Sequence, residues 1–209
     1  PGRLAMHGGE LPSVESVATP GTEIAARLDL GARGLVITSP GEVPRSLGEV
    51  DVVLPLLHGA YGEDGTLQGL LEMTGTSYAG AGVLASAAGM DKEYMKLIFA
   101  ARGLPVGRYV VVRDRDWRDR PAQTERKRVL DEIGELGWPL FVKPARGGSS
   151  IGITRASDQA GLEAAIEAAR EHDPKVLVEA AVDGMEIECA VLEGTGGGPP
   201  DASVPAQVL

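Results

Sequence analysis

The stretch that decides the fold is Leu140-Phe141-Val142-Lys143-Pro144-Ala145-Arg146-Gly147-Gly148-Ser149-Ser150-Ile151-Gly152. It predicts a strand that ends in a lysine, then a glycine- and serine-rich loop, then a second strand from about Ile151. Glycines let consecutive backbone N–H groups surround an anion, and the lysine adds a positive charge. We therefore interpret the stretch as a clamp for the phosphates of a nucleotide. A plain β-hairpin turn is the alternative, but it would need a shorter loop, and Arg146 is unusual in one.

Composition limits the classes of partner and of fold. The chain has 209 residues, enough for one large domain or two smaller ones. A formal net charge of -10 argues against a nucleic-acid partner but not against a nucleotide, which needs only a local cluster of lysines. The single Cys189 excludes an intrachain disulfide and is typical of the reducing cytoplasm. No apolar run reaches the roughly 18 residues of a membrane span and no signal peptide is seen. Both ends suggest a fragment.

The first part of the chain is typical of an α/β domain. Loops and short strands are expected up to residue 33, a strand at 35–38 and a loop at 40–48. The apolar run at 50–57 predicts a buried parallel strand. A glycine-rich loop follows at 58–65, and such a loop after a strand places a ligand at the carboxyl edge of an open sheet.

A helix is predicted to begin at Thr66, with Asp64 or Thr66 as its N-cap, and to stop at Gly75. Residues 78–86 are expected to form a Gly/Ala linker, with a domain boundary near residue 87. Asp91 is predicted to cap a helix that ends at residue 101. Four apolar side chains of that helix are expected to face a core: Tyr94, Met95, Ile98 and Phe99.

Residues 108–179 predict an α+β sheet layered with helices. Strands are expected at 108–112, 140–143, from 151, and at 175–179, with helices at 125–136 and around 162–169 and a charged loop at 113–120. The alternation at 186–192 predicts one more strand, with Cys189 directed into the core. The segment 194–200 is expected to be a loop, followed by the start of a strand.

Several charged residues are candidates for ligand binding. Lys92 lies in a helix first turn, where the helix dipole disfavours a cation unless an anion is bound. Glu179 and Glu186 are either solvated acids or an acceptor pair for an exocyclic amine and ribose hydroxyls, with Ala180, Ala181 and Val182 as an apolar strip beside adenine. His58 is either a turn histidine or a site residue. No Cys/His cluster is present, so no metal ligands are assigned.

Taken together, these residues resemble the D-alanine–D-alanine ligases of the ATP-grasp superfamily. The resemblance rests on five stretches: His58-Gly59-x-x-Gly62-Glu63-Asp64-Gly65-Thr66-x-Gln68-Gly69; Gly80-x-Gly82-Val83-x-Ala85-Ser86 with Met90-Asp91-Lys92; Gly103-Leu104-Pro105-Val106; the stretch 142–152; and Val178-Glu179 through Gly184-x-Glu186. It implies a partial ATP-grasp fold. Residues 1–87 would be part of an N-terminal Rossmann-like α/β domain, 88–182 the central ATP-grasp subdomain, and 183–209 the start of the C-terminal subdomain.

The resemblance also implies an activity: ATP-dependent joining of two D-alanines through an acyl phosphate, for peptidoglycan precursors. Its site residues would be Lys92 and Lys143 on the phosphates, Gly147, Gly148, Ser149 and Ser150 as the closing loop, Glu179, Ala180, Ala181, Val182 and Glu186 around the nucleoside, and His58 and Ser149 near the first D-alanine. Mg²⁺ would accompany ATP, with its ligands expected outside this sequence. A cytoplasmic homodimer is implied, with small-molecule substrates and neither nucleic acid nor membrane as partner. Two alternatives stay open: another ATP-grasp carboxylate–amine ligase, such as a D-alanine–D-lactate ligase, and a catalytically inert nucleotide-binding fragment.

Overall fold

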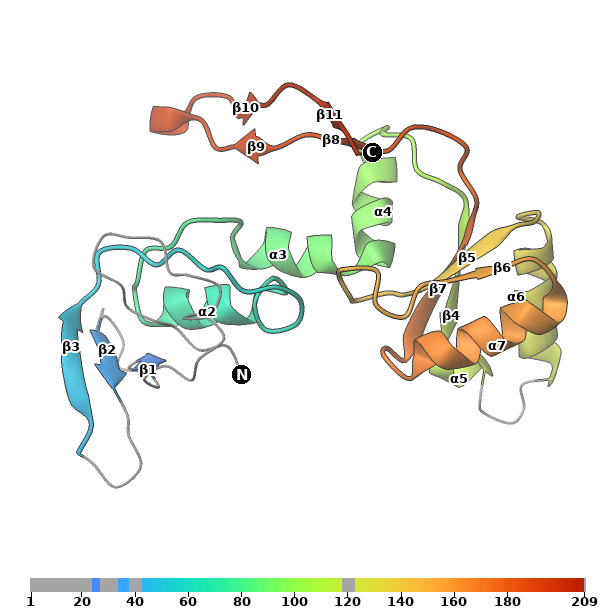
Figure 1. Ribbon diagram of the computed structural model, residues 1–209, viewed down its shortest axis with the longest axis horizontal. Coiled ribbons are helices and arrows are strands. Elements are labelled where there is room, and N and C mark those ends of the chain that lie inside the picture. Colours follow the sequence, from blue (N-terminus) through green and yellow to red (C-terminus); the bar gives the residue numbers. More distant parts are fainter. Residues whose placement is uncertain (1–23, 27–33, 38–42, 118–122, 209) are drawn as a thin grey trace.

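A computed structural model describes residues 24–26, 34–37, 43–117 and 123–208 (Figure 1). The centre of the part that carries the loop is a four-stranded antiparallel sheet in the order β4-β7-β5-β6. Its strands are β4 Tyr109–Arg113, β5 Leu140–Pro144, β6 Thr154–Ala156 and β7 Lys175–Ala180. The helices packed on it are α5 Asp114–Trp117, α6 Gln123–Gly134 and α7 Gln159–Arg170. Five of the expected elements (β4, β5, β7, α6 and α7) are thereby confirmed to within a few residues, and the second hairpin strand begins three residues later than expected.

The two faces of this sheet have different roles, because side chains alternate along each strand. Leu140, Val142, Val176 and Val178 belong to one fully buried cluster with residues of α6 and α7, among them Ile166. The intervening positions of β5 and β7 face the other side, where α4 and the glycine loop lie. One face therefore forms the core, and the opposite face is free to present charged groups.

The expected charged loop at 113–120 is partly helical. Residues Asp114–Trp117 form α5, and residues 118–120 lie outside the described chain. Trp117 is buried, donates its indole N–H to Glu167 Oε1 at 2.6 Å and stacks 4.2 Å from the guanidinium of Arg126. A large aromatic ring that also has a hydrogen-bond partner is more stable in the core than in a solvated loop. Burial of Trp117 therefore favours the helical turn over the expected loop.

The N-terminal part contains a three-stranded antiparallel sheet of β1 Ile24–Ala26, β2 Gly34–Ile37 and β3 Arg45–Glu49. The expected strand near residue 35 is confirmed, whereas β3 occupies half of the expected loop at 40–48. The expected buried strand at 50–57 is wrong: its only described pairing is a parallel bridge between Val53 and Tyr78, and Leu54 and Leu56 are exposed. An apolar run becomes a strand only where a neighbour satisfies its backbone groups, and one bridge does not provide that.

Helix α2, Thr66–Met73, begins and ends where the sequence predicts. Its N-cap is neither Asp64 nor Thr66 but Gly65, which has a left-handed φ of 90° and no side chain that could cap the helix. Asp64 still contributes, because its Oδ1 accepts the N–H of Thr66 at 3.0 Å. Gly75, at φ 68°, follows the helix in the conformation that glycine favours after a C-terminus.

Helix α3, Val83–Met90, replaces the second half of the expected linker, and the expected boundary near residue 87 falls inside it. Helix α4, Lys92–Ala101, follows at a sharp corner (Figure 1). Asp91 forms this corner: it is extended, with φ -91° and ψ 105°, and its carboxylate accepts the N–H groups of Glu93 and Tyr94. The N-cap at Asp91 is confirmed, but the expected buried face of α4 is wrong for three of its four members, since Tyr94, Ile98 and Phe99 are 41–56% exposed and only Met95 is half-buried. Described residues around that side line a pocket without filling it.

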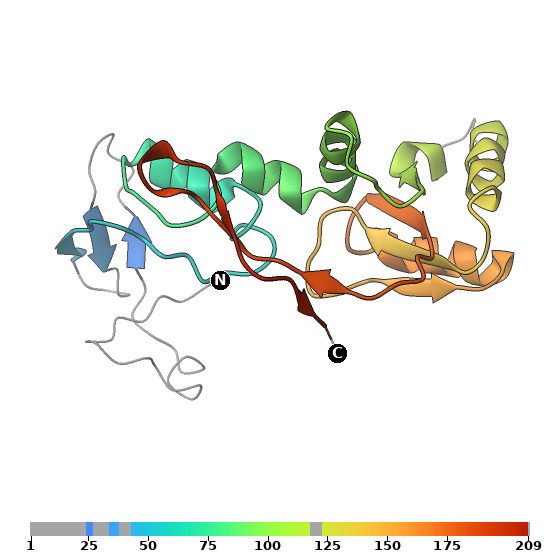
Figure 2. The same cartoon turned by 90° about the horizontal axis from the view of Figure 1, so that it is seen from above.

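The last described segment is a long, irregular hairpin rather than one strand (Figure 2). β8 Ile187–Glu188 pairs with β11 Ala206–Gln207, and β9 Val191–Leu192 pairs with β10 Asp201–Ala202. The short 3₁₀ helix Thr195–Gly197 turns the chain where a loop is expected. Cys189 is exposed and not in a core, because no described layer covers either face of this hairpin.

Candidate nucleotide-binding site

Lys143 and Glu179 meet on the open face of the sheet. β5 and β7 are antiparallel with Phe141 opposite Glu179 and Lys143 opposite Leu177, so Lys143 and Glu179 are diagonal neighbours on one face. The ammonium of Lys143 forms an ion pair with Glu179 Oε2. Helix α4 adds Lys96, whose Nζ lies 2.8 Å from Glu179 Oε1. Each oxygen of the Glu179 carboxylate is therefore paired with one lysine ammonium.

Glu179 is buried, with a side chain that is 11% exposed. Burial alone would raise the pKa of its carboxyl group. Hydrogen bonds and charge from Lys143 and Lys96 outweigh that effect and hold the pKa below its ordinary value. The site therefore contains an ionised acceptor at neutral pH, together with two cations.

Lys92 lies beside the first half of the glycine loop. Its backbone N–H donates to Ala145 O at 3.0 Å, and its Nζ donates to Gly147 O at 2.7 Å. Burial, and next the positive charge of Lys143, lower the pKa of the Lys92 ammonium. Two lysines that repel each other next to a glycine loop form a site that an anion would stabilise.

The base of the loop is fixed by Arg146 and Asp173. Asp173 Oδ2 accepts the backbone N–H of Arg146 at 2.8 Å and its Nε at 3.0 Å, and Oδ1 accepts Nη2 at 2.8 Å. Asp173 also caps the start of β7 by accepting the N–H of Lys175 at 2.9 Å. The guanidinium of Arg146 is therefore committed to the protein, and its place in the loop is structural.

The tip of the loop is exposed and unusually bent. Ser149 and Ser150 have φ values of 50° and 59°, in the left-handed region. Gly152, at φ 72°, has the ring of His172 and the ring of Pro144 so close that a Cβ would lie 2.6 Å and 2.8 Å from them. Glycine is required at that position by both space and backbone conformation.

The side chains around the corner at Asp91 bind α4 to the sheet. Lys175 Nζ lies 2.6 Å from Asp91 Oδ2 and 2.9 Å from Glu93 Oε2, and 4.6 Å from the centre of the Tyr94 ring. Arg113 donates to Glu93 Oε1 at 2.5 Å. This network fixes the first turn of α4, and with it Lys92.

A cavity of about 550 Å³ opens between Lys92, Gly147 and Gly148 on one side and the N-terminal part on the other. Its N-terminal wall includes Glu63, Gln68 and residues of α3. Gln68 is 6% exposed; its Nε2 donates to Gly62 O at 3.0 Å, and its Oε1 has no hydrogen-bond partner. The cavity adjoins Lys92 and the glycine loop and is large enough for a small molecule.

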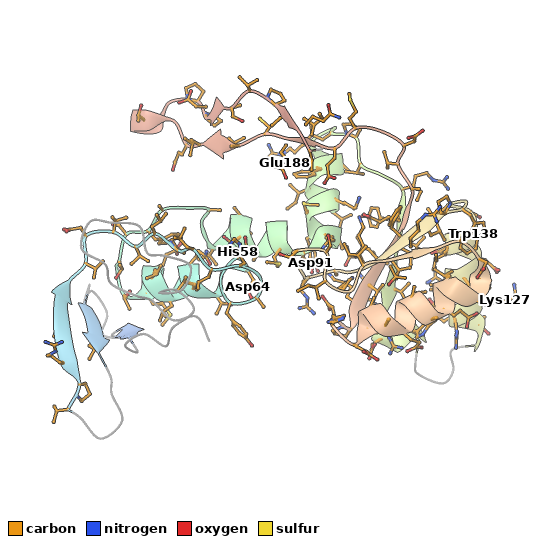
Figure 3. All side chains as sticks on the ribbon, in the orientation of Figure 1. His58, Asp64, Asp91, Lys127, Trp138 and Glu188 are labelled. Carbon is orange, nitrogen blue, oxygen red and sulfur yellow. The ribbon has the colours of Figure 1, made fainter. Side chains whose placement is uncertain are left out.

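The remaining expected residues lie apart from this cluster. His58 and Ser149 are exposed and are not among the residues that line the cavity, while Asp64 and Glu63 order the loop that follows His58 through the N–H groups of Tyr61 and Gly59 (Figure 3). Ala181, Val182 and Glu186 are exposed, between the end of β7 and β8. None of these described residues contacts Lys92.

The structure thus brings together Lys92, Lys143, Gly147, Gly148 and Glu179. It adds Lys96, which the sequence interpretation missed. The available signal was its spacing, since residues four apart lie on the same face of a helix and Lys96 follows Lys92 by four. In the part of the chain that the structure describes, no group of three or more His, Cys, Asp or Glu side chains could hold a metal ion. None of the described helices has the length and apolarity to cross a membrane.

Family models match most of the chain. The model for the C-terminus of D-ala D-ala ligase matches residues 98–208, and the model for its N-terminus matches residues 15–81. The chain is 57% identical over its whole length to a D-alanine–D-alanine ligase of Streptomyces griseus and 58% identical to that of Streptomyces coelicolor. It spans about half the length of these curated relatives, 53% in both.

Solved structures show the same architecture. A D-Ala:D-Ser ligase of Enterococcus faecalis, VanG, superposes with a TM-score of 0.73 at 33% identity, over 89% of this chain and 49% of that one. A D-alanyl-alanine synthetase A of Vibrio cholerae gives the same TM-score at 29% identity, over 90% and 52%. The likeness covers both the N-terminal part and the sheet with its loop.

Proposed function

The chain belongs to the D-alanine–D-alanine ligase family, with the corresponding ATP-grasp fold, and we propose that it supplies the phosphate and adenine contacts of an ATP-dependent D-alanine–D-alanine ligase. The observation that carries this proposal is the convergence of Lys92, Lys143 and Glu179 beside Gly147. Cations and loop N–H groups suit phosphates, and a buried carboxylate suits an amine donor.

The proposed reaction has two steps. A carboxylate oxygen of the first D-alanine attacks the γ-phosphorus of ATP, the bond to the β-phosphate oxygen breaks, and ADP leaves. The uncharged amine of the second D-alanine then attacks the acyl carbon, the C–O bond to phosphate breaks, and the nitrogen loses a proton. The products are D-alanyl-D-alanine, ADP and inorganic phosphate, which places the enzyme in the synthesis of peptidoglycan precursors.

In the first step the described residues work by position and charge. We assign Lys92 and Lys143 to the phosphates, where they offset the negative charge that moves during transfer. Gly147, Gly148 and Ser150 would cover the phosphates with backbone N–H groups, and Ser149 would order the first D-alanine together with His58. The cavity beyond Lys92 is the space we assign to that substrate.

We assign the nucleoside to the end of β7. Glu179 would accept a hydrogen bond from the exocyclic amine of adenine, with the backbone of Ala180 and Ala181 along the base edge and Val182 against its ring. Glu186 would bind the ribose hydroxyls. The support for Glu179 is direct, because the carboxylate is buried and ionised; Glu186 is supported by its place on the chain after that strand.

Magnesium is part of the proposal, because it usually binds through substrate phosphates with one or two protein carboxylates. Among the described residues no group of three or more His, Cys, Asp or Glu side chains lies together, and no step is assigned to a metal ligand of this chain. A cytoplasmic homodimer is likewise proposed; gel filtration with light scattering tests the dimer, and cell fractionation tests the compartment.

The second substrate defines the alternative ligases. The likeness to a D-Ala:D-Ser ligase at 33% identity makes an acceptor other than D-alanine a specific second candidate. D-lactate is the corresponding hydroxy acid, which would give an ester in place of an amide. Mass spectrometry of products formed from D-alanine with D-serine or D-lactate decides among these acceptors.

The deciding experiment measures phosphate release from ATP by the intact gene product, with and without D-alanine. We expect release that depends on D-alanine and matches the dipeptide formed. Release that does not respond to D-alanine, or to any of the acceptors above, would overturn the ligase proposal. The 209-residue chain on its own is expected to bind nucleotide without releasing phosphate; turnover by it would contradict the inert-fragment alternative.

A further inference from the structure

Glu179 holds two lysines whose surroundings differ. Lys96 Nζ lies 2.8 Å from Oε1, with a side chain that is 13% exposed, while Lys143 pairs with Oε2 and is 26% exposed. Lys96 also lies 5.3 Å from the centre of the Tyr109 ring. Tyr109 is opposite Glu179 in the register of β4 and β7, so Lys96 is enclosed between the carboxylate and an aromatic face.

Lys143 has an unfavourable neighbour, the ammonium of Lys92. Its charge lies close enough to Lys92 to lower the pKa of the Lys92 ammonium. Phosphates bound beside Gly147 would remove that repulsion and attract the more exposed of the two lysines on Glu179. Lys96 has no such alternative in the described site, since its contacts are Glu179 and the Tyr109 ring.

The departure of Lys143 would leave a buried carboxylate that must stay ionised. A carboxylate removed from water without a counter-ion takes up a proton and becomes a weaker acceptor. One remaining cation on Oε1 prevents this and leaves Oε2 free for a donor. The arrangement therefore divides the carboxylate into a permanently paired oxygen and an exchangeable one.

We propose that Lys96 is the permanent counter-ion of Glu179 and a positioning residue for adenine, whereas Lys143 exchanges Glu179 for the nucleotide phosphates. The inference rests on the proposed function, in which the nucleotide is ATP and Glu179 receives its exocyclic amine. Lys96 does not touch the nucleotide; it acts by keeping the acceptor charged and aimed.

Inosine triphosphate is the probe that isolates this role, because hypoxanthine has a carbonyl where adenine has an amine. Dissociation constants for ATP and ITP are measured on the intact gene product without D-alanine, so no turnover occurs. In Lys96→Met, we expect the ratio of the ITP dissociation constant to the ATP dissociation constant to fall about tenfold. This is the usual contribution of one charge-assisted hydrogen bond. Lys96→Arg keeps the charge and should retain the preference.

The pH dependence of the preference for ATP over ITP provides a second readout. The parent preference should be constant from pH 8 to 6, because the pKa of Glu179 is held low. In Lys96→Met it should fall further toward pH 6, since a buried carboxyl group that loses its cation has a raised pKa. In a Glu179→Gln background, Lys96→Met should have no further effect on the ratio.

Controls separate this role from folding and from the ligase proposal. Lys127→Met removes an exposed lysine on α6 and should leave both constants unchanged. If Lys96→Met does not fold, Lys96→Gln provides the same comparison by removing the charge while keeping a donor. An equal loss of ATP and ITP affinity, or an additive effect in Glu179→Gln, would overturn the inference. Failure of D-alanine-dependent phosphate release would overturn the ligase proposal while leaving these binding ratios intact.

Discussion

Lys175 Nζ lies 2.6 Å from Asp91 Oδ2, which joins the first residue of β7 to the N-cap of α4. Asp91 thereby has two partners at once, the N–H groups of the helix and the ammonium of the sheet. The same corner carries Lys92, whose position over the glycine loop depends on this junction. One carboxylate thus fixes the start of α4, which carries Lys92, against the start of β7.

Replacing Asp91 by alanine should destabilise the protein and weaken nucleotide binding together. Loss of the N-cap and of a partly buried charge partner predicts a fall of about 2 kcal/mol in the free energy of unfolding. Urea denaturation measures this fall, and calorimetric titration with ATP measures the second effect. Asp131→Ala, which removes an exposed partner of Lys127, is the control and should change stability by less than about 0.5 kcal/mol. Similar values for the two variants would contradict the role of Asp91.

Lys143→Ala should weaken ATP binding by about 1–3 kcal/mol, because one charge-assisted phosphate contact is lost. The fold should persist, since Glu179 keeps its pair with Lys96. Calorimetric titration of ATP into the variant and the parent measures the change, with Lys127→Ala as the matched control. Unchanged affinity for ATP would refute the phosphate contact.

Acid should destabilise the protein partly through Asp173. Burial opposes its ionisation, but hydrogen bonds from Arg146 and backbone N–H groups hold its pKa below the ordinary value. A carboxyl group with a lowered pKa in the folded state stabilises the fold above its unfolded pKa of about 3.9, and this contribution is lost as the pH falls through the folded value. Asp173→Asn should therefore cost about 1–3 kcal/mol at pH 7, and less at pH 3. Urea denaturation at both pH values tests this, and an equal deficit at each would count against it.

Ile166→Ala should destabilise the core by about 2–5 kcal/mol, because Ile166 is fully buried between α7 and the sheet. Ile151→Ala makes the same chemical change at a 60% exposed position and should have little effect on stability. Chemical denaturation of both variants gives the comparison. A small loss at Ile166 would mean that the α7 face of the sheet is not the core.

Glu186→Ala should raise the Michaelis constant for ATP more than that for D-alanine, because the ribose contact belongs to the nucleotide. Glu193→Ala, a nearby exposed acid on the same hairpin, is the control. Steady-state kinetics of the intact gene product with each substrate varied in turn measures both constants. Equal effects on the two would count against a ribose contact.

The sheet and its helices were predictable because their core is local. One apolar cluster joins the sheet to its helices, and all of its members lie within residues 108–179. They come mainly from β4, β5 and β7 on one side and from α6 and α7 on the other. The same reasoning gave a wrong prediction for the run at 50–57. Its apolar pattern is typical of a buried strand but does not specify the neighbouring strands with which it must pair. The predictions that one face of α4 and Cys189 are buried were wrong for the same reason. Burial of a side chain depends on which other elements cover it, and the local sequence does not show these.

The site was predictable where residue type decides chemistry. Lys92, Lys143 and Glu179 were identified from charge and position, and the structure brings them together. Lys96 was missed because a helix lysine is ordinarily solvated, and only the register of β7 shows that a carboxylate faces it. Arg146 looked suited to an anion in the sequence, whereas its partner Asp173, 27 residues away, was visible only in the fold.

The extended backbone at Asp91 separates two tasks. α3 and the far wall of the cavity lie before this residue, whereas Lys92 on α4 and Gly147 in the glycine loop both lie after it. A rotation at this corner would change the width of the cavity while keeping the contacts of Lys92 with Ala145 and Gly147. Under the proposed function, the nucleotide would then be retained while the cleft opens to admit the amino acid, so that the two substrates bind as separate events.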